Sequence, residues 1–173
     1  IIKGLHLKPS FSYYNNEGEN HSFERANEVI SNRPASANHD VDRQYQYEAV
    51  MNYTKSFKNI HNFNLTAGTN FIYSTEFDMG GTGYGGKSDY IETLNGTGKE
   101  GQTATSQFME KKTISYFGRL TYDFDRKYLL SASVRYDGSA HFAENNKFGT
   151  FPGVSAGWNM HRESFWEPMK DIV

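Results

Sequence analysis

The sharpest chemical motif in the sequence is the glycine-rich stretch GTGYGGKS, from Gly81 to Ser88. It satisfies the phosphate-loop pattern G-x-x-x-x-G-K-[ST], and its glycines also satisfy G-x-G-x-x-G. Such a site needs a buried strand before the glycines and a helix N-terminus after them, so that backbone N–H groups converge on the phosphate. Here the preceding segment alternates polar and apolar residues, and Asn95-Gly96 interrupts any helix after little more than one turn. We therefore expect a loop that binds no nucleotide.

Two groups of histidine and carboxylate residues are candidates for metal binding, namely His39 with Asp40 and Asp42, and His21 with Glu17 and Glu19. Neither group has the ligand spacing of a zinc site or an EF-hand. We interpret both as solvated loop residues, and calcium held by acidic outside loops stays open as an alternative. The sequence also assembles no Ser-His-Asp or Cys-His arrangement. We therefore assign no catalytic, cofactor-binding or metal residue, leave substrate contacts unassigned, and expect no enzyme.

Four charged residues, Arg119, Asp123, Arg135 and Asp137, fall at alternate positions of two neighbouring segments. On adjacent strands they would form a ladder of opposite charges, whose cross-strand pairs help to fix the register. Direct contact with a ligand is the alternative interpretation.

The segments that carry these charges predict the fold. Residues 114–124 and 128–137 place apolar or aromatic side chains on one parity and mostly polar side chains on the other. A period of two indicates a β-strand. Each segment has about ten residues or more, which is the length that crosses a bilayer at a tilt of about 45° and about twice the usual globular strand. They predict a hairpin of two transmembrane strands.

The same alternation predicts further strands near residues 2–14, 45–57, 63–77 and 151–160, the last with Phe151, Val154, Ala156, Trp158 and Met160 on one face. The predicted connections alternate between long (15–40, 78–111, 138–147) and short (58–59, 125–127, 161–167). Outer-membrane barrels have short periplasmic turns and longer outside loops. We therefore predict an all-β protein, a segment of about six strands from an antiparallel transmembrane β-barrel, with a mobile outside loop at 78–111.

The composition excludes several other classes. The 173 residues include no Cys, so there is no disulfide framework or thiolate metal site. The formal net charge of −2 gives no basic footprint for nucleic acid. Hydrophobic residues make up 36% of the chain and aromatic residues 16%. No continuous apolar stretch is nearly as long as a transmembrane helix, which needs about 18 apolar residues. A barrel is the membrane fold that suits this composition, because its apolar residues occupy alternate positions.

The segment YFGRLTYDFDRKYLLSASVRYDGS (116–139), followed by FAENNKFGTFPGVSAGWN (142–159) and RESFW (162–166), resembles the late-barrel signature of SusC/RagA-type TonB-linked outer-membrane proteins. The sequence departs from the family at Ala140-His141, where Ser and Arg are usual, and at Lys147-Phe148, where Arg-Trp is common. These positions lie in or beside an expected outside loop. They bear on ligand recognition and not on the fold.

The resemblance implies a barrel of some 22 strands, so we expect residues 1–173 to be part of such a barrel, with the signal peptide and plug domain outside this segment. It also implies energy-coupled import of glycan oligomers or peptides through the cell outer membrane. The implied partners are a SusD-like surface lipoprotein as a lid, TonB acting through the plug, and the surrounding outer-membrane lipid. The alternative is a secreted or periplasmic carbohydrate-binding β-sandwich, with Tyr45, Tyr47 and Trp158 stacking on sugars.

Overall fold

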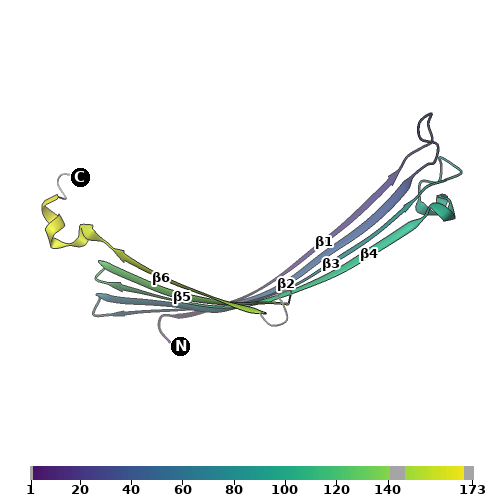
Figure 1. The fold of residues 1–173 in the computed structure, drawn as a ribbon. Helices are drawn as coiled ribbons and strands as arrows, with labels where there is room; N and C mark the ends of the chain where they lie inside the picture. Colours follow the sequence, from purple (N-terminus) through teal and green to yellow (C-terminus); the bar gives the residue numbers. More distant parts are fainter. Residues whose placement is uncertain (1, 141–146, 170–173) are drawn as a thin grey trace. The chain divides into compact units, whose positions relative to one another are not determined.

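In the computed structural model, which describes residues 2–140 and 147–169, the chain forms one six-stranded antiparallel sheet whose strands follow chain order (Figure 1). The strands are β1 (Leu5–Phe23), β2 (Ala35–Phe57), β3 (His61–Gly83), β4 (Thr103–Phe124), β5 (Tyr128–Ser139) and β6 (Phe148–Trp158). The predicted all-β class and the strand number are confirmed. Within the described residues there is no second sheet, which a β-sandwich would need for its core.

Short 3₁₀ helices occupy the connections. They are η1 (Leu94–Gly96), η2 (Lys99–Gly101), η3 (Met160–Arg162) and η4 (Ser164–Met169). Across the described part of the chain, none of the helices has the length and apolar character needed to cross a membrane.

Two tight turns set the β2–β3 and β4–β5 hairpins. Lys58 and Asn59 have φ of 52° and 59°, and Asp125 and Arg126 have φ of 51° and 55°. Two successive residues with positive φ characterise the type I′ turn, whose twist matches that of the flanking strands. The N–H of Lys127 closes the second turn by donating to the carbonyl of Phe124 at 2.9 Å. The predicted alternation of short turns with longer connections is therefore confirmed.

The strands β1 to β4 are longer than the sequence predicts. They have 19, 23, 23 and 22 residues, and the loops shrink to residues 24–34 and 84–102. The expected boundaries near residues 14, 45, 77 and 114 were wrong because the added parts are polar on both faces. Such a stretch has no alternation to reveal it. The β5–β6 connection is also shorter than expected, and its residues 141–146, including His141, lie outside the described residues.

The register of β4, β5 and β6 fixes which side chains share a face. Leu120 lies opposite Ala132, which lies opposite Val154. The neighbouring pair, Arg119 opposite Ser133, lies on the other face of the sheet. In β6 the apolar face carries Phe148, Pro152, Val154, Ala156 and Trp158. The expectation that Phe151 shares this face was wrong, because Phe151 lies opposite Arg135 on the polar face.

The chain comprises two compact units. Unit 1 consists of Ile1–Phe11, Gln46–Ile72 and Lys112–Val173, and unit 2 consists of Ser12–Tyr45 and Tyr73–Lys111. Among the described residues, the only buried hydrophobic side chains are Ala35 and Val41, and no large side chain is fully buried. Neither unit therefore has the close-packed core of a water-soluble domain.

Candidate functional site

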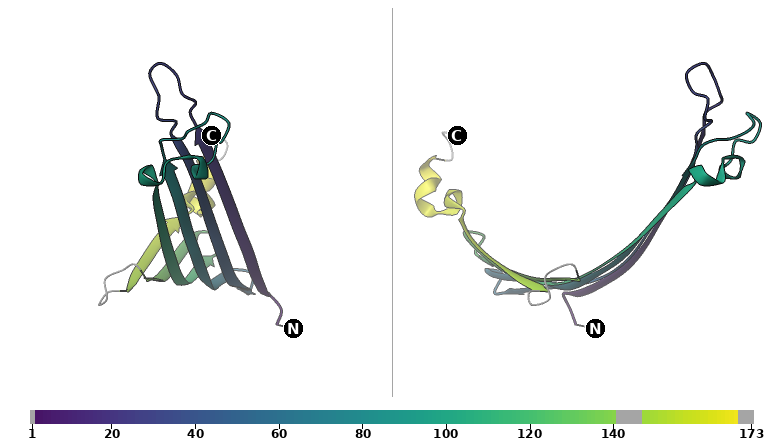
Figure 2. Two further views of the ribbon diagram at one scale, coloured as in Figure 1. Left: turned by 90° about the vertical axis from the view of Figure 1, so that its right-hand side faces the viewer. Right: turned by 45° about the vertical axis from the view of Figure 1, so that its right-hand side comes forward.

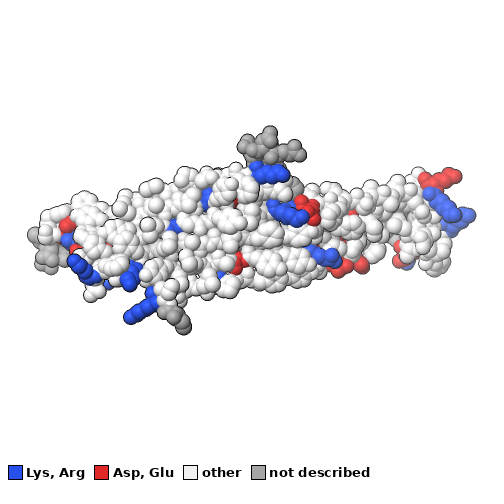
Figure 3. All heavy atoms as spheres, turned by 90° about the horizontal axis from the view of Figure 1, so that it is seen from below, with Lys and Arg blue, Asp and Glu red and all other residues white. Residues whose placement is uncertain are grey.

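The apolar face of unit 1 is an exposed band. Leu120 on β4, Leu130 on β5 and Val154 on the edge strand β6 expose 45%, 53% and 85% of their surface. Residues other than Lys, Arg, Asp and Glu make up most of the surface seen in Figure 3. A contiguous apolar patch of this extent marks a surface that meets lipid or another apolar partner.

Two rows of aromatic side chains border this band. We call the row near the tight turns the turn-side row; it contains Phe57, Phe63, Tyr122, Phe124, Tyr128 and Trp158, and its neighbouring rings lie 4.8 Å (Phe63–Tyr122) to 6.2 Å (Phe124–Tyr128) apart. The loop-side row contains Phe11, Tyr47, Phe71, Tyr136 and Phe148, with separations of 4.9 to 6.5 Å. Aromatic girdles on both sides of an apolar band are the pattern of a transmembrane barrel.

The spacing of the rows fits a bilayer. On β5 the band runs from Tyr128 to Tyr136, and these eight residue steps span about 26 Å at about 3.3 Å per residue. Tilted strands reduce this height, which leaves it close to the apolar band of about 25 Å seen in outer-membrane barrels. In unit 2, Tyr13, Tyr45 and Tyr73 form a further row at 4.9 and 6.2 Å. Tyr45, Tyr47 and Trp158 are thus members of aromatic rows and not isolated platforms for sugars.

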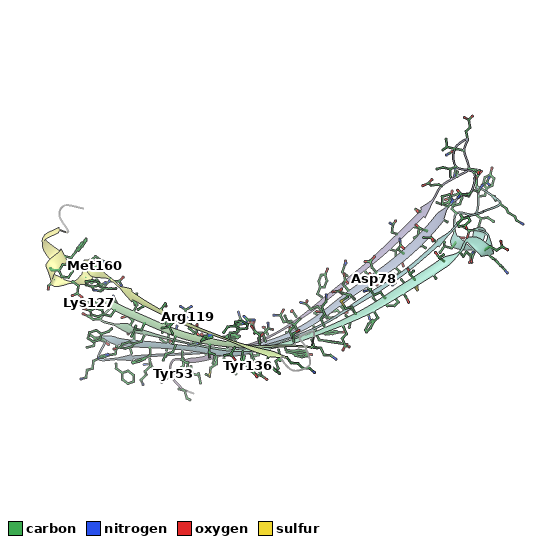
Figure 4. All side chains as sticks on the ribbon, in the orientation of Figure 1. Tyr53, Asp78, Arg119, Lys127, Tyr136 and Met160 are labelled. Atoms are coloured by element: carbon green, nitrogen blue, oxygen red, sulfur yellow. The ribbon has the colours of Figure 1, made fainter. Side chains whose placement is uncertain are left out.

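The opposite face of unit 1 is polar. Figure 4 shows Arg119 on one side of the sheet, with Tyr53 and Tyr136 on the other. Arg119 donates to the hydroxyl of Ser131 at 3.2 Å, and Asn62 donates to Asp123 at 3.4 Å. Phe117 is an apolar exception that packs over Gly68, where an added Cβ would lie 2.5 Å from its ring.

The predicted ladder of cross-strand opposite charges was wrong. The ion pair is Arg135 with Asp137, at 2.7 Å, and both belong to β5. Across the strands, Arg135 donates instead to the hydroxyl of Ser115 at 3.2 Å. The four charged residues do share the polar face, but hydroxyl and amide groups on the neighbouring strands satisfy them, because β4 presents no charge directly opposite Arg135 or Asp137.

In unit 2, the β1–β2 and β3–β4 connections form one joined structure, which we call the loop cap (residues 24–34 and 84–102). Figure 2 shows the two connections together at the same end of the strands. Arg33 donates to both carboxylate oxygens of Asp89, at 2.7 and 3.3 Å, and Ala26 N–H donates to Asp89 at 3.0 Å. A second pair joins Arg25 to Glu92 at 2.8 Å.

The Arg33–Asp89 pair is the strongest electrostatic feature of the loop cap. Hydrogen bonds from Arg33, and then from the Ala26 N–H, hold the pKa of Asp89 below its usual range. The mobility of the loop at 78–111 stays a prediction, but these contacts were not predicted from the sequence. The loop has many glycines, but side chains and backbone of the neighbouring connection bind it. The sequence signal that we missed is the pairing of two lone arginines in 24–34 with two acids in 89–92.

The glycine-rich motif does not form a phosphate cradle. Gly81 and Gly83 belong to β3, and residues 89–93 carry no helix after the motif. The carbonyl of Gly86 accepts from Arg33 at 3.2 Å, which ties the motif to the loop cap. Gly85, with φ of 79°, is the position in the motif whose backbone requires glycine.

The candidate metal ligands lie on strands and not in loops. His39 lies 3.5 Å from Glu17 and 3.7 Å from Glu19, all on one face of β1 and β2, while Asp40 and Asp42 occupy the other face of β2. The structure thus separates His39 from Asp40 and Asp42, whereas His21 stays 3.9 Å from Glu19 on one face of β1. No cluster of three or more histidine or acidic side chains suited to a metal occurs within the residues that the structure describes.

A polar cluster that the sequence did not predict closes the turn side of unit 1. Glu163, after β6, accepts from Tyr128 Oη at 2.7 Å and from Trp158 Nε1 at 3.2 Å, and Lys127 Nζ lies 3.5 Å away. The hydrogen bonds from Tyr128 and then Trp158 lower the pKa of Glu163. Tyr128 and Trp158 are directly opposite each other on the apolar face. Glu163 therefore binds the polar ends of two side chains of the turn-side row.

Comparison with known proteins shows what this sheet is similar to. No protein-family model matches the chain. TonB-dependent receptor P39 of Formosa agariphila is 29% identical over 98% of the chain, and TonB-dependent receptor SusC of Bacteroides thetaiotaomicron is 42% identical over 34% of it. The solved structure of the RagAB peptide transporter matches 96% of the chain with a TM-score of 0.82 and 25% identity.

The chain spans only a small part of these proteins: 17% of P39, 6% of SusC and 19% of the matched RagAB chain. Their names are those of receptors and transporters. The long match to one protein, the short strong match to SusC and the structural match agree with the apolar band, its aromatic rows and the polar opposite face. The chain is therefore a β-barrel segment of a TonB-dependent receptor of the SusC/RagA type.

Proposed function

We propose that residues 1–173 form part of the barrel wall of an outer-membrane transporter that imports glycan oligomers or peptides with energy supplied through TonB. The observation that carries the proposal is the exposed apolar band of unit 1 between two aromatic rows, with a polar face behind it. In this proposal the apolar band contacts lipid, and the polar face lines a water-filled lumen.

The lengths of the connections support an orientation in the membrane. The tight turns at 58–60 and 125–127 face the periplasm in this proposal, and the loop cap of unit 2 faces outside. Apart from the row of Tyr13, Tyr45 and Tyr73, the strands of unit 2 are mostly polar on both faces, as expected for strands in water. Glu17 and Glu19 lie on the same face as Tyr13 in β1, which would be costly in contact with lipid.

The partners follow from this placement. A SusD-like surface lipoprotein would act as a lid at the loop-cap end, and TonB would act through a plug domain elsewhere in the parent protein. Other strands of the parent would pair with the free edges of β1 and β6, since an unpaired edge in lipid leaves backbone groups unsatisfied. Energy coupling and gating would belong to the plug, so this segment supplies the wall and the outside loops.

The experiment tests orientation and transport in the full-length receptor that carries this segment. Lys87→Cys in the loop cap and Lys58→Cys in the β2–β3 turn are a matched pair, because both lysines are exposed. On intact cells, a membrane-impermeant thiol reagent should label position 87 and leave position 58 unlabelled until the outer membrane is permeabilised. Uptake of fluorescent oligosaccharides and peptides by the same cells should depend on the receptor and on TonB.

Equal labelling of both cysteines on intact cells would contradict the barrel orientation. Receptor-dependent uptake that survives deletion of TonB would contradict the energy coupling and leave the orientation standing. Retention of labelled glycan by a soluble, detergent-free segment would instead favour the carbohydrate-binding protein.

A further inference from the structure

A hollow of about 380 Å³ lies at the turn side of unit 1, lined by Asp125, Lys127, His161 and Arg162. Two connections build it, the β4–β5 turn and the segment of η3 that follows β6. Figure 4 shows Lys127 and Met160 at this same end of the strands. Its lining combines two permanent cations and a histidine with one carboxylate.

The Glu163 cluster places this hollow beside the lipid-facing rim. Glu163 binds Tyr128 Oη and Trp158 Nε1, and both aromatic side chains belong to the turn-side row on the apolar face. The ring of Phe165 lies 6.2 Å from that of Trp158, which adds a further aromatic contact after η3. Aromatic rows of this kind lie at the depth of the lipid headgroups. The hollow therefore lies at that depth too.

The charged side chains of the hollow differ in whether other residues already pair with them. Lys127 is shared, since its Nζ lies 3.5 Å from Glu163 and 3.7 Å from Asp125. Arg162 forms no ion pair with any side chain described in the ranges 2–140 and 147–166, and its guanidinium matches phosphate oxygens in a bidentate geometry. Asp125 adds a carboxylate acceptor to the same wall. A ligand with a phosphate and an ammonium group would satisfy both Arg162 and Asp125.

We propose that this hollow binds the headgroup of a zwitterionic aminophospholipid, with its phosphate at Arg162 and Lys127 and its ammonium at Asp125. The inference rests on the proposed function, which turns this end of the barrel toward the phospholipid leaflet on the periplasmic side. The acyl chains then lie along the apolar band beside Trp158 and Tyr128. A purely anionic headgroup fits less well because Asp125 would repel it.

The test uses the full-length receptor, purified in detergent and analysed by native mass spectrometry with lipids of identical acyl chains. We expect phosphatidylethanolamine to be retained more strongly than phosphatidylglycerol and phosphatidylcholine. Loss of a charge-assisted hydrogen bond, in Arg162→Gln, should weaken phosphatidylethanolamine retention about tenfold or more. Arg126→Gln is the matched control, because Arg126 lies in the neighbouring β4–β5 turn and does not line the hollow. Asp125→Asn should remove the preference over phosphatidylglycerol.

Several results would overturn the proposal. Equal retention of the three lipids, or equal effects of Arg162→Gln and Arg126→Gln, would show that the hollow recognises no headgroup. Displacement of the bound lipid by millimolar inorganic phosphate would indicate a simple anion site. Lipid retention is measured independently of uptake. A lack of transport by the unmodified receptor would therefore count against the proposed function, and a lack of lipid selectivity would count against this headgroup site.

Discussion

Leu120→Arg is the substitution that most directly tests the lipid-facing band. Leu120 lies opposite Ala132, which is four residues from Tyr128 and four from Tyr136 on β5. At about 3.3 Å per residue, Leu120 is about 13 Å along the strand from both aromatic rows. An arginine side chain cannot reach either interface from there. The charge should therefore destabilise the folded barrel by about 2–4 kcal/mol, the cost of arginine at the bilayer midplane.

Thr121→Arg is the matched control because the neighbouring residue lies on the opposite face of the same strand. Thr121 lies opposite Ser131, between Arg119 and Asp123 on the polar face. In a water-filled lumen, Thr121→Arg should cost less than about 1 kcal/mol, as surface substitutions commonly do.

The assay is heat modifiability on gels, combined with urea unfolding of the full-length receptor in lipid vesicles. Folded barrel should be depleted for Leu120→Arg and nearly unchanged for Thr121→Arg. Equal loss in the two variants would refute the assignment of faces. A greater loss for Thr121→Arg would reverse it.

Three further predictions concern the loop cap and a turn. Because Arg33 holds the pKa of Asp89 below its ordinary value of about 4, their contact should stabilise the cap above that pH and be lost as the pH falls through the lowered pKa. A spin label at Ser88→Cys should therefore gain mobility on acidification, and Asp89→Asn should give that mobility already at pH 7. A label mobility that does not change with pH would contradict the contact. Gly85→Ala, at φ of 79°, should destabilise the folded loop cap by about 1–2 kcal/mol and make it sensitive to protease. The control Gly98→Ala, at φ of −69°, should be tolerated. Equal protease sensitivity of the two variants would argue against the positive φ at Gly85. Arg126→Gly should stabilise the type I′ turn by about 1 kcal/mol, since Arg126 has φ of 55°, and a lowered urea midpoint would contradict the turn geometry.

Alternation predicted the fold wherever the two faces of a strand meet different solvents. The β4–β5 hairpin shows this clearly, because Leu120 and Leu130 share one face, and Arg119 and Ser133 share the other. The same signal failed for residues 15–23 and 35–44, where Glu19 and His39 occupy the face that carries Tyr13 and Tyr45 nearer the band. With water on both sides, neither face selects apolar residues, so sequence alone cannot separate such a strand from a loop.

The contacts of the candidate site were less predictable than the strands. The Arg33–Asp89 pair joins residues 56 positions apart, and Glu163 meets Tyr128 across 35 positions. No local pattern links such residues, because the sheet register and the turn lengths bring them together. Phe151 shows the limit in a single strand, since the apolar residues of 151–160 suggest one parity and the register with Arg135 assigns Phe151 to the other face.

The absence of a packed core in the described residues bears on how this sequence changes over time. A core residue must match the shape of its neighbours, and a change of one methylene group is felt. Leu120, Leu130 and Val154 are exposed on the apolar face, and fluid acyl chains adapt to any apolar side chain of moderate size. Exchange among Leu, Ile, Val and Phe is then nearly neutral at these positions. Such exchange would lower sequence identity and leave the fold unchanged, which is the relation seen in the RagAB match, with 25% identity at a TM-score of 0.82.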